Sequence, residues 1–326
     1  MTISGNLDFA AGSVSGNSKG TTISTRDVTA STSVIRIIAV EDLGGGMRAT
    51  AAFGLDPRHL ANDNGAAATN TFGRDELFVG LSGGFGNIRL GSPNSIGVTT
   101  FLAASPLGTG IGSGYAALAG DYSFVRHDRS ARYDSPVIGG FTLSALHAPG
   151  GDQTAATLPA FVGNNSAVTE VGVRYAKGPL TIAFANIAQA AQTNAATAPV
   201  VAAGSVKTSS NILAASYALG ATTLSAGWND GDARARAATV TKTEGYRLGA
   251  THSMGALTLL ASYGQQTAGT TTKVTEKVTG LRADYALSKR TVSYLGYENM
   301  DTGVAAASTP TTGKRSIVAI GVRHSF

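Results

Sequence analysis

The sequence of 326 residues contains no cysteine, which excludes disulfide scaffolds, cysteine-ligated zinc and thiol catalysis. Charge is also scarce, at 14% of residues, and the 25 Lys and Arg residues are dispersed, without a run of five or more. Although the formal net charge is +5, dispersed cations are not typical of a nucleic-acid surface, so we expect no nucleic-acid partner. Apolar runs fall well short of the roughly 18 residues that a membrane-spanning helix requires.

What the sequence does have is a two-residue alternation of apolar and small or charged side chains. Val171, Val173 and Tyr175 form one face of such a segment, and Gly172 and Arg174 form the other. The pattern recurs in 246–249, 281–285 and 320–326. Because side chains alternate across a strand, each segment predicts a β-strand with one apolar face. In a membrane only a closed sheet of such strands satisfies every backbone amide, so we expect a barrel.

The connections between these segments alternate between short and long. Seven short ones carry Gly or Pro, at 42–46, 83–86, 135–140, 177–179, 219–220, 254–255 and 288–290. Eight longer stretches, rich in Gly, Ala, Thr and Asn, lie near 14–30, 56–73, 92–128, 148–166, 190–207, 230–242, 266–276 and 300–313. This rhythm predicts an all-β fold, a 16-stranded antiparallel transmembrane β-barrel that forms one domain over residues 1–326.

Five segments along the chain resemble one known family. They are 2–8 (TISGNLD), 40–46 (VEDLGGG), 78–86 (FVGLSGGFG), 130–136 (SARYDSP) followed by 139–141 (GGF), and 321–326 (GVRHSF). Together they are similar to the trimeric general porins of β-proteobacteria, in particular to the anion-selective porins of comamonad-type bacteria. The resemblance implies an outer-membrane diffusion channel with short periplasmic turns and long external loops, and no enzymatic activity.

The same resemblance implies how the chain assembles and where its pore narrows. The third loop, 92–128, would fold inward as the constriction loop, and the second loop, 56–73, resembles a latch that reaches into a neighbouring subunit of a homotrimer. Outer-membrane lipid and lipopolysaccharide would surround the barrel. The chain opens directly into strand-like sequence without a signal peptide, so we expect Met1 to be a start codon placed on a mature form.

Arginines within the strands predict a basic lumen. A lipid-facing Arg costs roughly 2–4 kcal/mol at the bilayer midplane, so strand arginines should point inward. The resemblance places Ile35 and Ile37 outward, which turns Arg36 into the lumen. It implies a pore constriction that contains Arg36 and Arg132, with Arg74 and Arg126 beside them. The basic lumen wall would comprise Arg174, Arg247, Arg282, Arg315 and Arg323.

The constriction loop lacks carboxylates over 92–120, so we expect its arginines to have no matching acidic wall. That arrangement predicts selectivity for small anions such as chloride, phosphate and carboxylates. One position of the predicted constriction departs from what the resemblance implies. Relatives place an arginine where this chain has Asp75, so Arg74 reaches the lumen only if the strand bulges there. Arg126 would otherwise anchor the third loop or bind lipopolysaccharide phosphates.

Two alternatives remain from the residues alone. An outer-membrane barrel enzyme would need a catalytic constellation, and the five histidines, at 59, 127, 147, 252 and 324, share no motif. A substrate-specific channel would favour a row of aromatic side chains along the lumen, whereas most aromatics here share parity with the lipid face. We therefore predict a diffusion channel without a cofactor or a metal.

Overall fold

The computed structural model describes residues 1–18, 21–30, 32–55, 57, 72–105, 108, 110–113, 126–149, 167–190, 208–234, 240–269, 273–301 and 314–326. Side chains are described for these residues apart from 17–30, 72–74, 233–234 and 240–241. The six longest predicted loops therefore lie partly or largely outside the described residues, among them the predicted latch at 56–73.

The described chain is almost entirely strand. The strands are β1 (Thr2–Ser18), β2 (Thr21–Ala30), β3 (Val34–Gly44), β4 (Met47–Leu55), β5 (Phe72–Gly83), β6 (Gly86–Ser92), β7 (Ser130–Asp134), β8 (Phe141–Ala148), β9 (Val168–Lys177), β10 (Leu180–Gln189), β11 (Thr208–Leu219), β12 (Thr222–Arg234), β13 (Val240–Met254), β14 (Leu257–Ala268), β15 (Val274–Ala286), β16 (Thr291–Asp301) and β17 (Lys314–Ser325). One helix, α2 (Ile96–Leu102), lies between β6 and β7. Nowhere in the described part of the chain does a helix have the length and apolarity that a bilayer crossing needs.

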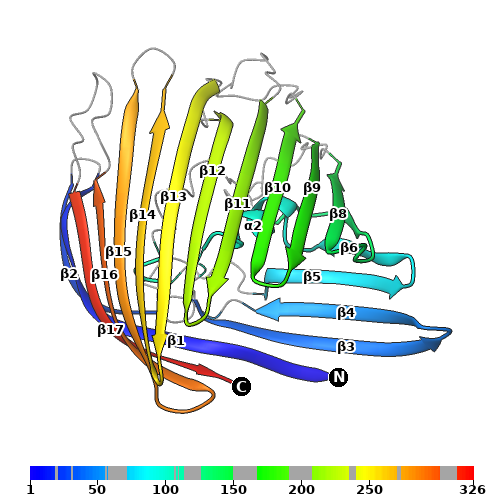
Figure 1. Cartoon of the computed structure of the whole chain (residues 1–326), viewed down its shortest axis with the longest axis horizontal. Helices are drawn as coiled ribbons and strands as arrows, with labels where there is room; N and C mark the ends of the chain where they lie inside the picture. Colours follow the sequence, from blue (N-terminus) through cyan, green and yellow to red (C-terminus); the bar gives the residue numbers. More distant parts are fainter. Residues whose placement is uncertain are drawn as a thin grey trace.

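The strands form a closed antiparallel barrel, which has sixteen strands, as the sequence predicts, when β2 and β3 are counted as one. Consecutive strands pair with one another, except that β2 and β3 both pair with β1. β1 also closes the ring by pairing with β17 in a register that runs from Asn6↔Ser325 to Gly16↔Arg315. The first and last strands therefore lie side by side (Figure 1). β2 and β3 both pair with β1, so these two segments form a single strand of the barrel that is interrupted between Ala30 and Val34.

Side chains of β1 compensate for that interruption. The Asp8 backbone N–H donates to Ser33 Oγ at 2.9 Å, and Thr32 Oγ1 donates to Asp8 Oδ2 at 2.7 Å. Asn6 Nδ2 donates to the Thr32 carbonyl oxygen at 2.7 Å. Because buried backbone groups need partners, these side-chain bonds replace ladder bonds that the break removes.

The predicted short turns lie where the sequence places them, but several predicted loops are shorter than expected. The 14–30 stretch was predicted as a loop and is strand, because β1 extends to Ser18 and pairs with β2 from Thr21 onward. Likewise β12 continues to Arg234 and β14 to Ala268. The Thr, Ser and Val residues of 14–30 suit a strand, and in all three segments cross-strand pairing supplies hydrogen bonds that a free loop would leave to water.

The two faces of the barrel wall differ in chemistry. Large apolar side chains of alternate positions are exposed on the outside, among them Val79, Leu143, Leu248 and Ile320. On the inward parity the strands carry small and charged residues. This division matches a wall with hydrocarbon on one side and water on the other.

Candidate functional site in the barrel lumen

The segment after β6 lies inside the barrel and narrows its lumen. Figure 1 shows α2 behind β10 and β11, on the inner side of the wall. Ile96 and Phe101 of α2 pack into a buried cluster with Leu146 on β8, Val168 on β9 and Ile212 on β11. The lumen face of these strands is therefore apolar only where the loop covers it.

A buried carboxylate holds the start of α2. Glu170 on β9 is 1% exposed, and its Oε2 accepts the backbone N–H groups of Ile96 at 2.6 Å and Gly97 at 3.0 Å. Its Oε1 lies 2.6 Å from His127 Nε2, near the other end of the same loop. The Ser95 hydroxyl caps the helix by accepting from the Val98 N–H at 3.0 Å. Glu170 thus joins both ends of the loop to the wall, and a negative charge at this helix terminus is favourable.

Beyond α2 the loop continues along the inner wall toward β16. Arg247 on β13 donates to Ser105 Oγ at 2.5 Å, and its guanidinium lies 4.8 Å from the centre of the Phe101 ring. Ser262 on β14 donates to the Gly112 carbonyl oxygen at 2.9 Å. A Cβ at Gly280 on β15 would lie 1.9 Å from the same oxygen, so the loop backbone touches the wall where the wall has no side chain.

Arg36 and Arg126 meet on one carboxylate. Arg36 Nε of β3 lies 2.5 Å from Asp75 Oδ2, and Arg126 Nη2, where the third loop returns to the wall, contacts Asp75 Oδ1. The predicted lack of an acidic partner is therefore wrong for both arginines. The reason is a bulge in β5, where the register with β4 shifts between Phe53 and Leu55. The bulge turns Asp75 inward, while the Arg74 side chain lies outside the described residues.

Arg132 belongs to a second cluster, where the same prediction of a missing acidic partner is also wrong. Its Nη2 lies 2.9 Å from Asp134 Oδ1, and Arg89 on β6 contacts Asp134 Oδ2. Arg132 Nη1 also donates to the Asn94 carbonyl oxygen at 2.7 Å. Arg132 is 7% exposed, so it holds the start of the loop to the wall and presents little charge to the lumen water.

The predicted basic wall splits into paired and less paired arginines. Arg282 lies 2.5 Å from Asp284 and stacks 3.6 Å from the centre of the Tyr294 ring, and Arg315 lies 3.7 Å from Glu298. Arg247 is buried under the loop. Within the described part of the chain, Arg174 and Arg323 make no ion pair.

Sequence reasoning missed several lumen residues that these contacts reveal. They are Asp8, Asp75, Glu76, Arg89, Asp134, Glu170, Asp284, Tyr294 and Glu298. Arg89 could have been found, since Ile88 and Leu90 flank it in the alternating pattern used for the other arginines. Asp134 and Asp284 could also have been found, since each lies two residues after its arginine on the same face of one strand. The acidic partners on other strands could not, because strand register decides which inward side chains meet.

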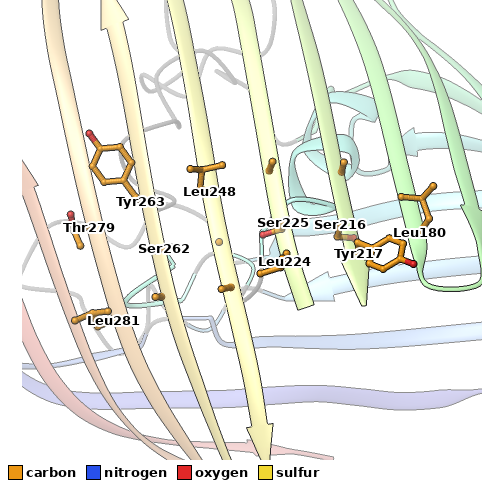
Figure 2. Close-up of a pocket in the computed structure, with 15 residues that line it drawn as sticks. Leu180, Ser216, Tyr217, Leu224, Ser225, Leu248, Ser262, Tyr263, Thr279 and Leu281 are labelled. Atoms are coloured by element: carbon orange, nitrogen blue, oxygen red, sulfur yellow. The ribbon is translucent and has the colours of Figure 1, made fainter. Parts of the chain in front are cut away.

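The hollow in Figure 2 lies on the other side of the wall. It measures about 730 Å³ and is lined by outward side chains of β10 to β15, including Leu180, Tyr217, Leu224, Leu248 and Tyr263 (Figure 2). Its lining is almost wholly apolar, and its large side chains share the lipid-facing parity. It is a depression in the hydrocarbon-facing surface and not an entrance to the lumen.

The four histidines within the described residues lie apart from one another on different strands and loops. His147, His252 and His324 each contact a threonine hydroxyl of a neighbouring strand. His127 contacts Glu170, as above, and His59 lies outside the described residues. Among the residues that the structure describes, no group of three His, Asp or Glu side chains could hold a metal ion.

Comparison with protein families decides the identity of this barrel. The model of the Gram-negative porin family matches residues 1–304. The chain belongs to the Gram-negative porin family. The porin resides in the outer membrane, in agreement with its apolar outer belt.

Known relatives agree over part of their length. The major outer membrane protein P.IB of Neisseria gonorrhoeae is 32% identical over 151 residues, which are 46% of this porin and 39% of that protein. Outer membrane porin protein 32 of Delftia acidovorans is 32% identical over 161 residues, which are 47% of this porin and 43% of that protein. The matches thus span less than half of these relatives.

Solved structures agree over the whole chain. The anion-selective porin from Comamonas acidovorans superposes with a TM-score of 0.82 at 24% identity, covering 100% of this porin and 99% of that chain. The trimer form of OmpT, an outer membrane protein of Vibrio cholerae, superposes with a TM-score of 0.65 at 13% identity, covering 100% and 99%. At these identities the likeness shows the fold.

Proposed function

We propose that this porin is a water-filled, anion-selective diffusion channel for small solutes such as chloride, phosphate and small carboxylates. The observation that carries the proposal is the charge of the lumen next to the third loop. Arg36 and Arg126 both contact the carboxylate of Asp75, so these three side chains together carry one positive charge. The loop itself contributes no acidic residue over 92–120.

The remaining lumen charges favour the same sign. Arg174 and Arg323 face inward without an ion pair among the described residues, whereas the acidic side chains Asp134, Asp284 and Glu298 each have an arginine partner. A unit charge about 7 Å from an ion in water contributes near 0.6 kcal/mol. A small excess of arginines therefore predicts several-fold preference for anions and no absolute exclusion of cations.

The test is the reversal potential of the channel in a planar bilayer under a potassium chloride gradient. We expect the wild type to give the sign of an anion-selective channel and Arg36→Ala to reduce that potential. Lys177→Ala removes the same charge at the end of β9, next to a periplasmic turn, and should leave the potential nearly unchanged. A cation-selective wild type would refute anion selectivity.

We propose in addition that the channel assembles as a homotrimer in outer-membrane lipid and lipopolysaccharide. The trimeric form of one structural relative and the exposed apolar side chains of β1 and of β3 to β6 support this assembly. Electrophoresis of the unheated protein in mild detergent should give a band near three times the 32.9 kDa chain mass, which collapses to the monomer on boiling.

A further inference from the structure

We propose that Asp75 is a specificity-determining residue of this pore, a resident counter-ion that lowers the anion preference of Arg36 and Arg126. The inference concerns the same channel as the proposed function. It differs in predicting that this chain weakens its own selectivity by a built-in carboxylate.

The geometry of the three side chains is that of an occupied anion site. Each Asp75 carboxylate oxygen faces a different guanidinium, Oδ2 that of Arg36 and Oδ1 that of Arg126. Two guanidinium groups that converge on one carboxylate are what a permeant carboxylate or phosphate would require. Asp75 therefore occupies the place that a passing anion would otherwise take.

Exposure shows which side of this cluster the water meets. The Asp75 side chain is 5% exposed, whereas those of Arg36 and Arg126 are 36% and 22% exposed. The carboxylate lies beneath the two guanidinium groups. Ions in the lumen therefore meet two cations whose summed charge the carboxylate has reduced by one.

The backbone around Asp75 has room for this arrangement. The β5 bulge brings the residue inward, and Gly54 on β4 leaves the space that Asp75 enters. A Cβ at Gly54 would lie 2.5 Å from the Asp75 Cβ and 2.9 Å from Asp75 Oδ2. Bulge and glycine are independent features that both place this carboxylate at the two arginines.

The consequence for permeation follows from simple electrostatics. Removing one negative charge about 7 Å from the ion path raises the local anion concentration about threefold and lowers that of cations by a similar factor. The anion-to-cation permeability ratio should therefore rise several-fold at about 0.1 M salt. The change should shrink at 1 M salt, where the Debye length is only about 3 Å.

The experiment compares Asp75→Asn with the wild type in planar bilayers. The expected result is a several-fold shift of the permeability ratio toward anions, together with inhibition of the chloride current by millimolar inorganic phosphate that the wild type lacks. Asp232→Asn is the matched control, because it removes the same charge from a pair with Lys242 on β12 and β13, away from the loop. An unchanged ratio in Asp75→Asn, or a shift toward cations, would overturn the proposal.

A second comparison keeps the test decisive if Asp75→Asn alone fails to assemble. Arg36→Gln and Arg36→Gln/Asp75→Asn are then compared, since the double variant restores the net charge of the pair. The double variant should be the more anion-selective, and equal ratios would overturn the proposal. A cation-selective wild type would refute the proposed function, yet an anion-directed shift on loss of Asp75 would still support the role of Asp75.

Discussion

Glu170 makes more loop contacts than any other single side chain discussed above. It accepts two backbone N–H groups of α2 and contacts His127, all in a buried environment. Glutamine has the same size, but it carries no charge and only one of its two terminal atoms can accept a hydrogen bond. We expect Glu170→Gln to reduce the free energy that attaches the loop to the barrel wall by about 1–3 kcal/mol, the usual cost of leaving a buried donor unsatisfied.

The loosened loop should be visible in two measurements. Single-channel recordings of Glu170→Gln should show increased current noise, and the loop should become more susceptible to trypsin at Arg126 and Arg129. Glu41→Gln, at an exposed position of β3, serves as the control. Recordings and digestion rates equal to those of the wild type would mean that the carboxylate does not hold the loop.

Gly280 tests the far end of the loop. The Gly112 carbonyl oxygen would lie 1.9 Å from a Cβ added at Gly280. A backbone oxygen and a Cβ are both held by the main chain, so no side-chain rotation can relieve this clash. Gly280→Ala should displace the loop from β15 and alter the single-channel conductance by a measurable fraction. At Gly84 a Cβ would meet nothing within 4 Å, so Gly84→Ala should leave the conductance unchanged.

At the scale of elements, α2 is a short helix whose position depends on its apolar side. Seven residues are too few for an isolated helix to be stable, so packing must supply the stability. Phe101 is 5% exposed and packs against both the apolar cluster on β8, β9 and β11 and the Arg247 guanidinium of β13. Phe101→Ala should reduce the packing free energy of α2 on the barrel wall by about 3–5 kcal/mol.

Hydrogen exchange of the α2 amides measures that loss directly. The amides of Phe101→Ala should exchange faster than those of the wild type, while the β-strand amides keep their protection. Thr99→Ala is the control on the same helix, because its hydroxyl bonds only to carbonyl oxygens of Ser95 and Ile96. Unchanged exchange in α2 would show that other contacts determine the position of the helix.

The elements themselves were largely predictable from sequence. Alternation identified the strands, and glycines that take positive φ, such as Gly178 and Gly255, marked the tight turns. The 14–30 stretch was assigned wrongly, because Thr and Ser are typical both of external loops and of strands that continue past the membrane. Alternation also predicted inward arginines such as Arg247, which the structure places on the lumen side.

The partners of those arginines were not predictable in the same way. Asp75 lies in a bulge that reverses the local parity, and no alternation reveals a bulge in advance. Arg132 and Asp134 are two residues apart on one face and could have been paired, but Arg89 joins them only through the register of β6 and β7. Local sequence therefore predicted the wall, whereas the charge of the pore depends on contacts between distant segments.

At the scale of the whole molecule, the two faces of the wall tolerate charge differently. Leu248 is 53% exposed on the outer face near the middle of β13, and it borders the apolar hollow of Figure 2. Leu248→Arg should destabilise the folded barrel by about 2–4 kcal/mol in a bilayer. Thr251→Arg places the same side chain on the inward parity of the same strand and should cost less.

Refolding titrations in lipid vesicles compare these variants. The urea midpoint of Leu248→Arg should lie below that of Thr251→Arg and below that of the wild type. Equal midpoints for the two arginine variants would contradict the assignment of the outer face to lipid.

The pairing of β1 with β17 has a consequence for biogenesis. These strands are separated by nearly the whole chain. The two edge strands of the sheet can therefore pair only after every intervening hairpin has formed. Until β1 and β17 pair, both edge strands expose backbone amides that hydrocarbon cannot satisfy. Insertion of such a protein must therefore finish with the pairing of β1 and β17. A truncated chain that lacks β17 would remain an open sheet.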